Sequence, residues 1–422
     1  MLKTATILVF IFTIFFSLSE CQKNNVCKNI KDYLDIDNNT DCWYNPDVGA
    51  SPEEIITRWG YPFETHNFTT EDGYINVLYR IPHDNTDTNI TRQPILLHGG
   101  LGGGPLTFLY IGNRSLAFFL VDEGFDVWLS NRRGSLNGKV HRDYEKTDEQ
   151  FWNFTFHECG FYDIKAEINL IADENTSHKK IILLGFSMGS TETYIYAMLR
   201  KKHANNHLAG IISISPIAFM TRSGGVIAKL APFATLIESF LRKGNLHALA
   251  LTEEGAKEDE NFRLSFPKIV FSKSFLEFIV GKDSSQTEAA DLPVYFRSKT
   301  TPTSIKTLIH FSQEVNAGGQ FQYYDYGISK NLNLYKSIHP PPYNLSKIRV
   351  PVHLFYGEGD RLSSEQDVLK LYDSLTMKKK SLTCIPEDKS VRFNHADFTL
   401  ARDIKELLYE VLLKTIREKL SG

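Results

Sequence analysis

The sequence predicts an α/β fold from three features. Short β-branched runs alternate with longer amphipathic stretches, as strands and helices alternate in α/β proteins. Several of the short runs are almost continuously apolar, which is typical of parallel strands covered on both faces. The chain has 422 residues, 42% of them hydrophobic and 23% charged, and is long enough to bury a large core without metal or disulfide staples.

The strand candidates fall into two groups along the chain. Between them, apolar helical stretches at 226–241 and 269–280 alternate with charged or proline-containing loops, and no clear strand is evident. We therefore expect a mostly parallel sheet in a core of two parts, 22–216 and 347–422, interrupted by a helical cap or lid insertion at 217–346. The strand candidates are residues 94–97, 125–129, 180–184, 210–215, 351–356 and 381–385.

Residues 1–21 predict a secretory signal peptide, because Lys3 precedes an apolar run at 7–18 and small residues follow it. The run is shorter than the roughly 20 residues that span a bilayer, and no later uncharged stretch reaches that length, so we expect no stable transmembrane anchor. A secreted or lysosomal protein is predicted. Seven Asn-X-Ser/Thr sequons predict a glycosylated surface: Asn38, Asn67, Asn89, Asn113, Asn153, Asn175 and Asn344.

The formal net charge is −3, from 47 Lys and Arg against 50 Asp and Glu. The basic residues are scattered rather than clustered, which excludes nucleic acid as an expected partner. The oligomeric state is left open by the sequence.

Removal of the signal peptide leaves too few cysteines for a disulfide framework. Cys27 and Cys42 could close a short N-terminal loop or stay unpaired. We interpret Cys159 and Cys384 as buried thiols rather than nucleophiles. No Cys-x-x-Cys or Cys/His spacing suggests zinc, so no metal is predicted.

Residues 181–189 (IILLGFSMG) predict a serine nucleophile. A buried-looking strand runs into the pattern Gly-x-Ser-x-Gly, and a helix-compatible stretch follows it. The glycines two positions before and after Ser187 are needed because a Cβ in so sharp a turn would collide with its neighbours. The turn lifts the serine to the start of a helix, where the dipole favours developing negative charge. The alternative is a glycine-flanked turn in the core.

A serine hydroxyl needs a base, and the base needs a carboxylate to orient it. We expect the order serine, acid, histidine along the chain. Asp360 lies just past the strand candidate at 351–356, at the same sheet edge as Ser187, and is the predicted acid. Glu358 and Asp367 are alternatives, since carboxylates are also common in turns.

His395 is the predicted base among thirteen histidines. It follows the last strand candidate on a polar connection and opens the last helical region. His98 precedes two glycines at the end of an earlier strand, where we interpret it as positioning the oxyanion loop. His353 lies within a strand candidate and is interpreted as packed.

The oxyanion hole is expected to use the backbone N–H of Met188 and one N–H from the glycine-rich loop at 97–104. The competing interpretation of this loop is a phosphate cradle. Such a cradle needs a terminal Lys-Ser/Thr or a Gly-x-Gly-x-x-Gly fingerprint with a later acidic residue, and Pro105 and the aromatic residues after it supply neither. No cofactor is predicted.

Sequence blocks spread along the chain match one known family in order. They are 55–62 (IITRWGYP), 70–75 (TEDGYI), 124–134 (GFDVWLSNRRG), 151–156 (FWNFTF), 162–163, 303–304, 310–313 (HFSQ), 321–322, 325–327 (DYG) and 341–344 (PPYN). With these blocks, the chain resembles the acid lipase family of α/β-hydrolases, the group of gastric, lingual and lysosomal acid lipases, from about residue 54 to 414.

The resemblance implies an α/β-hydrolase core with a lid and hydrolysis of triacylglycerols or steryl esters. It also implies a nucleophile at Ser187, an acid at Asp360, a base at His395 and oxyanion donors at the N–H groups of Met188 and Gly100. Three departures stand out: the usual GHSQG is GFSMG here, the residue after His98-Gly99 is glycine rather than leucine, and the insertion lacks cysteines. Lid behaviour and substrate preference are the properties these departures affect.

The insertion carries two dense apolar clusters, at 226–241 and 266–280. Most of these side chains are expected to pack the cap onto the core, but they also fit a tunnel for acyl chains. Our hypothesis is a lipid ester hydrolase acting at a membrane, micelle or droplet surface. The alternatives are acyl transfer by the same residues and a lipid-binding protein on a catalytically weak hydrolase scaffold.

Overall fold

A computed structural model describes residues 23–82, 92–135, 138, 140–175, 178, 180–224, 228–229, 231–249, 265–282, 285–298 and 302–420. The predicted signal peptide, the sequon at Asn89 and residues 226, 227 and 230 of the first predicted cap helix lie outside this part of the chain. Over the described ranges, no helix combines the length and the apolar character needed to cross a membrane.

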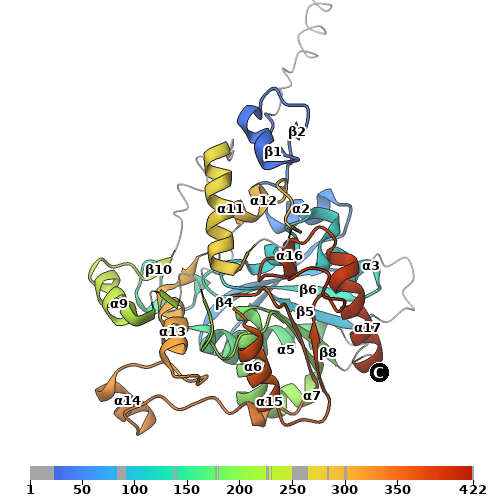
Figure 1. The fold of residues 1–422 in the computed structure, drawn as a ribbon. Helices are drawn as coiled ribbons and strands as arrows, with labels where there is room; N and C mark the ends of the chain where they lie inside the picture. The colour runs from blue at the N-terminus through green and yellow to red at the C-terminus, as the bar shows by residue number, and fades with distance from the viewer. Residues whose placement is uncertain are drawn as a thin grey trace, which may run out of the picture.

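The central sheet has nine strands among the described residues (Figure 1). Six neighbouring strands are parallel, in the order β13, β12, β9, β8, β5, β6. These are the six strands predicted from the sequence, and the α/β class with a mostly parallel sheet is confirmed. Their bounds are β5 (Pro94–His98), β6 (Asp126–Asn131), β8 (Ile181–Phe186), β9 (Leu208–Ile214), β12 (Val352–Tyr356) and β13 (Lys380–Cys384).

Three antiparallel strands at one side of the sheet were not predicted. β4 (Tyr74–Ile81) pairs with β6, and β3 (Glu64–Thr69) and β7 (Val140–His141) pair with β4. β3 forms an edge of the sheet and has the sequence ETHNFT, in which only Phe68 is buried. A half-exposed edge strand needs few apolar residues, so its sequence gives a weak signal.

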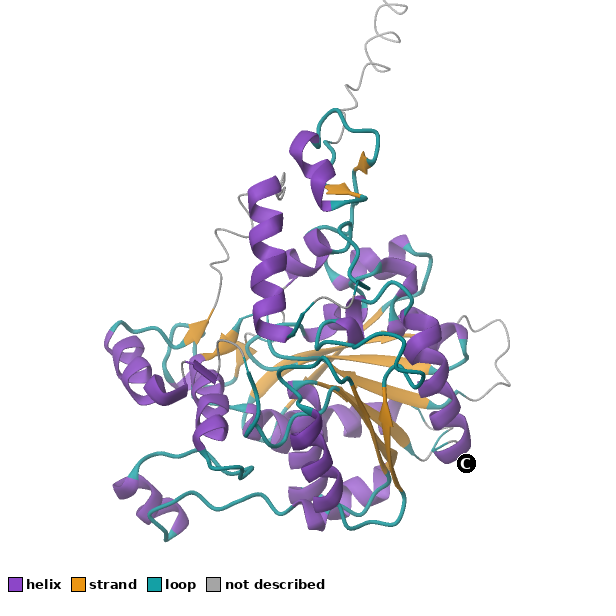
Figure 2. Ribbon diagram, in the orientation of Figure 1, coloured by secondary structure: helices purple, strands orange, loops and turns teal. Residues whose placement is uncertain are grey.

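Helices cover both faces of the sheet (Figures 1 and 2). Along β5, Ile95 and Leu97 join one buried layer with α3 and α17, whereas Leu96 joins the other with α5, α6 and α15. This burial on both faces accounts for the continuous apolar runs in the sequence. The helices of the core are α2 (Pro52–Arg58), α3 (Leu116–Asp122), α4 (Phe156–Glu158), α5 (Ile164–Glu174), α6 (Met188–Leu199), α7 (Lys201–His207), α15 (Glu365–Ser374), α16 (Asp397–Leu400) and α17 (Glu410–Lys419).

The described residues between β9 and β12 are mainly helical, and they also form a small sheet. A two-stranded antiparallel sheet pairs β10 (Ala248–Leu249) with β11 (Thr303–Ser304), where no strand was expected. Strands of two residues leave no readable alternation in a sequence. Figure 1 shows α11 and α12 standing beyond one end of the sheet, with α9 and α13 to one side. The helices are α9 (Ala234–Lys243), α11 (Phe266–Val280), α12 (Leu292–Ser298), α13 (Ile305–Asn316) and α14 (Ile328–Tyr335).

α11 is apolar around much of its circumference, and only part of that surface is buried. Ile269, Leu276 and Val280 are buried, whereas Phe271 is 70% exposed and Phe275 46% exposed. On α9, Leu236 and Phe240 are likewise exposed. The expectation that most apolar side chains of these segments pack the cap onto the core is therefore wrong for the outer faces of both helices.

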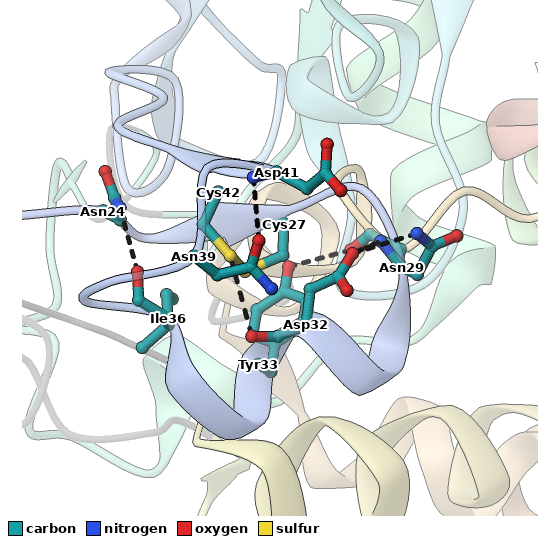
Figure 3. Close-up of a disulfide and its surroundings, with 10 residues drawn as sticks. Asn24, Cys27, Asn29, Asp32, Tyr33, Ile36, Asn39, Asp41 and Cys42 are labelled. Carbon is teal, nitrogen blue, oxygen red and sulfur yellow. Dashed lines mark hydrogen bonds between the residues drawn. A yellow bond between two sulfur atoms is a disulfide. The ribbon is translucent and has the colours of Figure 1, made fainter.

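The N-terminal segment is closed by a disulfide between Cys27 and Cys42 (Figure 3). β1 (Val26–Cys27) pairs with β2 (Cys42–Trp43) around this bond, and the short helix η1 (Ile30–Asp35) lies in the loop between them. η1 packs against α11, and the Tyr33 hydroxyl donates a hydrogen bond to the carbonyl of Ala289 at 3.0 Å. The disulfide therefore stiffens a segment that supports the helix above the sheet.

Replacing Cys27 and Cys42 together by serine should loosen this segment. Closing a loop of 15 residues is worth up to about 3 kcal/mol. We expect faster limited proteolysis within residues 28–41 and a lower urea midpoint. Cys384→Ser, which removes a thiol that forms no disulfide, is the control. Equal cleavage rates in the double variant and the wild type would contradict the expectation.

Candidate active site

Ser187 sits at a sharp turn between β8 and α6. Its backbone has φ 55° and ψ −122°, a conformation that non-glycine residues rarely adopt. The turn is possible because glycines flank it: a Cβ on Gly185 would lie 2.6 Å from the backbone nitrogen of Ser190, and one on Gly189 would collide with the carbonyl of His98. The Ser187 hydroxyl is thus held at the N-terminus of α6.

His395 lies in the loop between β13 and α16, and its Nε2 is 2.8 Å from the Ser187 Oγ. The side chain of Asn394 shapes this loop by accepting hydrogen bonds from the N–H groups of Ala396 and Asp397. The N–H of His395 donates to the carbonyl of Val280, the last residue of α11. The imidazole is therefore fixed from both the core and the insertion.

Asp360 lies in the loop after β12 and faces the other nitrogen of the imidazole. Its Oδ2 and Oδ1 are 2.9 and 3.1 Å from His395 Nδ1. Oδ1 also accepts hydrogen bonds from the N–H groups of Leu362 and Ser363, each at 2.8 Å. Arg361, the next residue, donates its N–H to the carbonyl of Val280. These bonds orient a carboxylate whose side chain is wholly buried.

The alternative acids and bases have other partners. Glu358 forms an ion pair with Lys389, which lowers the pKa of the Glu358 carboxyl. Asp367 accepts hydrogen bonds from the N–H of Arg222 and the hydroxyl of Ser364. His353 contacts the Ser381 hydroxyl within the sheet, and burial lowers its pKa to about 4.

The glycine-rich loop after β5 reaches Ser187. A Cβ on Gly100 would lie 3.2 Å from the Cβ of Ser187, so the Gly100 backbone is beside the serine. Arg132 donates hydrogen bonds to the carbonyls of Gly99 and Gly100. In a trans peptide the N–H points opposite to the carbonyl. The Gly99 carbonyl and the Gly100 N–H belong to the same peptide group. Because Arg132 holds this carbonyl, the Gly100 N–H points away from Arg132.

Two of the departures from the family pattern, Phe186 before the serine and Gly100 in the glycine-rich loop, lie against each other. The same Cβ on Gly100 would lie 3.2 Å from two ring carbons of Phe186. The Phe186 ring also contacts the imidazole of His395, with centroids 5.2 Å apart. The aromatic ring before the serine therefore occupies space that a larger residue at position 100 would need.

A buried charged cluster lies behind the glycine loop. His98 Nε2 is 2.6 Å from Glu167 and its Nδ1 is 2.9 Å from Glu192, and all three side chains are fully buried. Glu192 also pairs with Arg132 at 3.4 Å, and the Ser130 hydroxyl donates to Glu167. Burial by itself lowers the pKa of His98, but the two carboxylates outweigh it and raise the pKa to about 9.

The predicted sequons mostly lie on the surface. Asn38, Asn67, Asn113, Asn153 and Asn344 are exposed. Asn175 differs from the expectation of an exposed sequon. The residue is only 9% exposed, and its amide group donates to the Arg92 carbonyl and to Asp126. Those bonds occupy the nitrogen to which a glycan would be attached.

Among the described residues, the two cysteines outside the disulfide, Cys159 and Cys384, do not have the environment of a nucleophile. Burial raises the pKa of both Cys159 and Cys384, which disfavours the reactive thiolate. Over the described residues, no group of three or more His, Cys, Asp or Glu side chains is arranged to hold a metal ion.

Sequence reasoning missed Ser215, Arg132, Glu167 and Glu192. The Ser215 hydroxyl contacts both Asp360 and His395. Its position at the end of the strand candidate at 210–215, beside the strand of the nucleophile, is a signal that could have found it. Glu167 and Glu192 lie in helices, where nothing in the linear sequence indicates that their carboxylates meet at His98.

Comparison with known sequences identifies the class of protein. The model of a family described as "alpha/beta hydrolase fold" matches residues 93–397, and that of a "partial alpha/beta-hydrolase lipase region" matches residues 52–110. The solved structure of the alpha/beta hydrolase GrgF from Penicillium sp. sh18 superposes with a TM-score of 0.50 at 16% identity, covering 85% of this chain and 99% of that chain. That likeness concerns the fold alone.

Curated relatives narrow the class to one family. Gastric triacylglycerol lipase from Bos taurus is 31% identical over 383 residues, which cover 89% of this chain and 93% of the relative. Gastric triacylglycerol lipase from Homo sapiens is 30% identical over 385 residues, covering 89% and 92%. Lipase member K from Mus musculus is 29% identical over 383 residues, covering 90% and 94%. The chain belongs to the acid lipase family of α/β hydrolases, as its sequence blocks indicate, and is a carboxylic ester hydrolase.

The charged cluster at His98 should make stability depend on pH. The pKa of His98 is raised from 6.5 to about 9 in the folded protein, so the protonated cluster stabilises the fold below about pH 6.5 and loses this contribution as the pH rises through about 9. Glu167→Gln removes one carboxylate and favours the neutral imidazole. We expect the variant to melt a few degrees below the wild type at pH 6.5 and to approach it by about pH 9.5.

Thermal unfolding followed by tryptophan fluorescence at several pH values measures this difference. Glu174→Gln, a substitution at a partly exposed glutamate on the same helix, is the control and should track the wild type. A constant gap between the Glu167→Gln variant and the wild type from pH 6.5 to 9.5 would show that His98 does not titrate with folding.

Proposed function

We propose that the protein hydrolyses apolar lipid esters, triacylglycerols or steryl esters, through Ser187, His395 and Asp360. The Ser187 oxygen attacks the ester carbonyl while its proton passes to Nε2 of His395. The imidazolium then gives this proton to the leaving alcohol, and an acyl-enzyme remains. Water gives a proton to the same nitrogen as it attacks the acyl carbon. The bond from that carbon to the serine oxygen then breaks, and Nε2 returns the proton to this oxygen, so that the fatty acid and the free serine are released. No cofactor enters these steps.

The observation that carries the proposal is the pair of contacts of His395. Its Nε2 is 2.8 Å from the nucleophile oxygen and its Nδ1 is 2.9 Å from a carboxylate. A base within hydrogen-bond reach of the proton it removes, and itself oriented by a buried acid, is the arrangement that acyl transfer requires.

The N–H groups of Met188 and Gly100 are the proposed donors to the oxyanion. Met188 begins α6, where N–H groups have no acceptor within the helix. The Gly100 peptide is oriented by Arg132 and lies beside Ser187. Because these donors belong to the main chain, the departures at positions 100 and 188 leave them in place. Each such donor is typically worth about 3 kcal/mol in the transition state.

The apolar outer faces of α9 and α11 support a lipid substrate presented at a membrane, micelle or droplet surface. Leu236 and Phe240 on α9 are 70% and 75% exposed, and Phe271 on α11 is 70% exposed. Large exposed apolar side chains favour transfer into an apolar phase. The relatives named gastric triacylglycerol lipase support the same class of substrate.

We further propose that the protein is secreted or lysosomal. The predicted signal peptide, five exposed sequons and the Cys27–Cys42 disulfide support this, because disulfides persist in oxidising compartments. Residues 217–346, which contain α9 and α11, are the proposed lid domain.

The nucleophile is tested by labelling with a fluorophosphonate. We expect the wild type to carry one label at Ser187 and to hydrolyse p-nitrophenyl butyrate, and Ser187→Ala to lose at least about 10⁴-fold in kcat. Mass spectrometry locates the label, and an unchanged melting temperature shows that the variant is folded. A folded Ser187→Ala protein with wild-type esterase activity would overturn the proposal.

The substrate class is tested with emulsified trioleoylglycerol, cholesteryl oleate and soluble p-nitrophenyl butyrate across pH. Phe240→Ser on α9 should slow hydrolysis of the emulsified esters severalfold, because it removes apolar surface that enters the lipid, and should leave the soluble ester unaffected. Leu332→Ser, at a 46% exposed residue of α14, is the control. Equal losses on soluble and emulsified esters would exclude a surface role for α9.

A further inference from the structure

Ser215 is a buried hydroxyl at the point where Asp360 and His395 meet. Its Oγ is 2.5 Å from Asp360 Oδ2 and 2.6 Å from His395 Nδ1, and the residue has no exposed surface. We propose that Ser215 is a positioning residue of the active site, which holds the carboxylate and the imidazole in the geometry that catalysis needs. This inference rests on the proposed function of Ser187, His395 and Asp360.

The direction of the hydrogen bonds follows from the chemistry of the three groups. An ionised carboxylate only accepts, so the Ser215 hydroxyl donates its proton to Asp360 Oδ2. The lone pairs of the Ser215 oxygen then remain for the N–H at Nδ1 of His395. With the proton on Nδ1, the other nitrogen, Nε2, presents its lone pair to the Ser187 hydroxyl. Ser215 thus favours the tautomer that can act as a base.

Ser215 also completes the hydrogen bonding of a buried charge. Oδ1 of Asp360 accepts from two backbone N–H groups, those of Leu362 and Ser363, whereas Oδ2 faces Ser215 and His395. A buried carboxylate is tolerated only when its oxygens have donors. Ser215 supplies a hydrogen-bond donor to Oδ2 of Asp360 throughout the reaction, both when the His395 imidazole is neutral and when it is protonated on both nitrogens.

The backbone of Ser215 is held in an uncommon conformation. Its φ is 49°, and the next residue is Pro216, which further restricts the residue before it. Among the described non-glycine residues with positive φ, Ser187 and Ser215 are buried, and the other four are exposed. Both of these buried serines place their hydroxyl within hydrogen-bond distance of the His395 imidazole. Such conformations cost about 1–3 kcal/mol and persist where the surrounding structure imposes them, commonly at active sites.

The sheet explains why the two serines lie side by side. β8 and β9 are neighbouring parallel strands, and Phe186 is paired with Ile214, so Ser187 and Ser215 each follow a paired residue. The N–H of Ser187 donates to the carbonyl of Ile214, and the N–H of Ser215 donates to that of Phe355 on β12. The register of β8 against β9 therefore fixes the positions of both serines.

The segment after Ser215 is anchored to the two elements that carry its neighbours. The N–H of Ile217 donates to the Ser190 hydroxyl on α6, and the carbonyl of Ile217 accepts from the Thr191 hydroxyl. The carbonyl of Pro216 accepts from the hydroxyl of Ser363, in the loop of Asp360. These bonds tie the Ser215 backbone to both the nucleophile helix and the acid loop.

Two substitutions separate the effect of the Ser215 hydroxyl from the effect of its backbone conformation. Ser215→Ala removes the hydroxyl and keeps the strain, whereas Ser215→Gly removes the hydroxyl and accommodates positive φ. We expect both to lower kcat on p-nitrophenyl butyrate by about 10- to 100-fold, with KM within twofold of the wild type. Fluorophosphonate labelling of Ser187 should slow by a similar factor. Ser213→Ala, which removes a buried hydroxyl two residues earlier, on β9, should keep wild-type rates.

The melting temperature distinguishes positioning from a structural role. If Ser215 acts by positioning, the two variants lose similar activity although their melting temperatures differ, and the downfield Nδ1–H proton resonance of His395 shifts in both. Activity that follows the melting temperature, or kcat within twofold of the wild type in both folded variants, would overturn the proposal. If Ser187→Ala also remained active, the proposed function itself would have failed, which is a different outcome.

Discussion

Parallel strands end at one edge of a sheet, and the positions of Ser187, Ser215, Asp360 and His395 depend on this constraint. β8, β9 and β12 are neighbours, and Ser187, Ser215 and Asp360 follow their carboxyl ends. β13 lies next to β12 and leads to the loop of His395. Residues far apart in the chain therefore meet within hydrogen-bond distance because the order of the strands puts their ends side by side.

The sequence predicts the parts of this arrangement that have a local signal. The six parallel strands are buried on both faces and read as continuous apolar runs, and the turn at Ser187 requires glycines at fixed positions. The sequence predicts Asp360 and His395 because each follows a strand candidate at the expected edge of the sheet. β3 was missed because an exposed edge strand needs little apolar character.

The remaining parts of the site depend on contacts that no local pattern encodes. Glu167 and Glu192 come from two helices and meet only at His98, and Arg132 reaches the glycine loop from the end of β6. Asn175 follows the same rule, because its sequon is local but its burial beside Asp126 is tertiary. Removing charges from water is costly, so each member of the buried cluster depends on its partners, and taking one away leaves an uncompensated charge.

The carbonyl of Val280 links the chain between β9 and β12 to the loops of Asp360 and His395. It ends α11 and accepts hydrogen bonds from the N–H groups of both Arg361 and His395. A rigid swing of α11 that carried its C-terminal end away from the sheet would break both bonds and release the loops next to the carboxylate and the imidazole. A movement that admits a bulky ester and keeps both hydrogen bonds must therefore either pivot α11 about this carbonyl or displace other parts of the chain between β9 and β12.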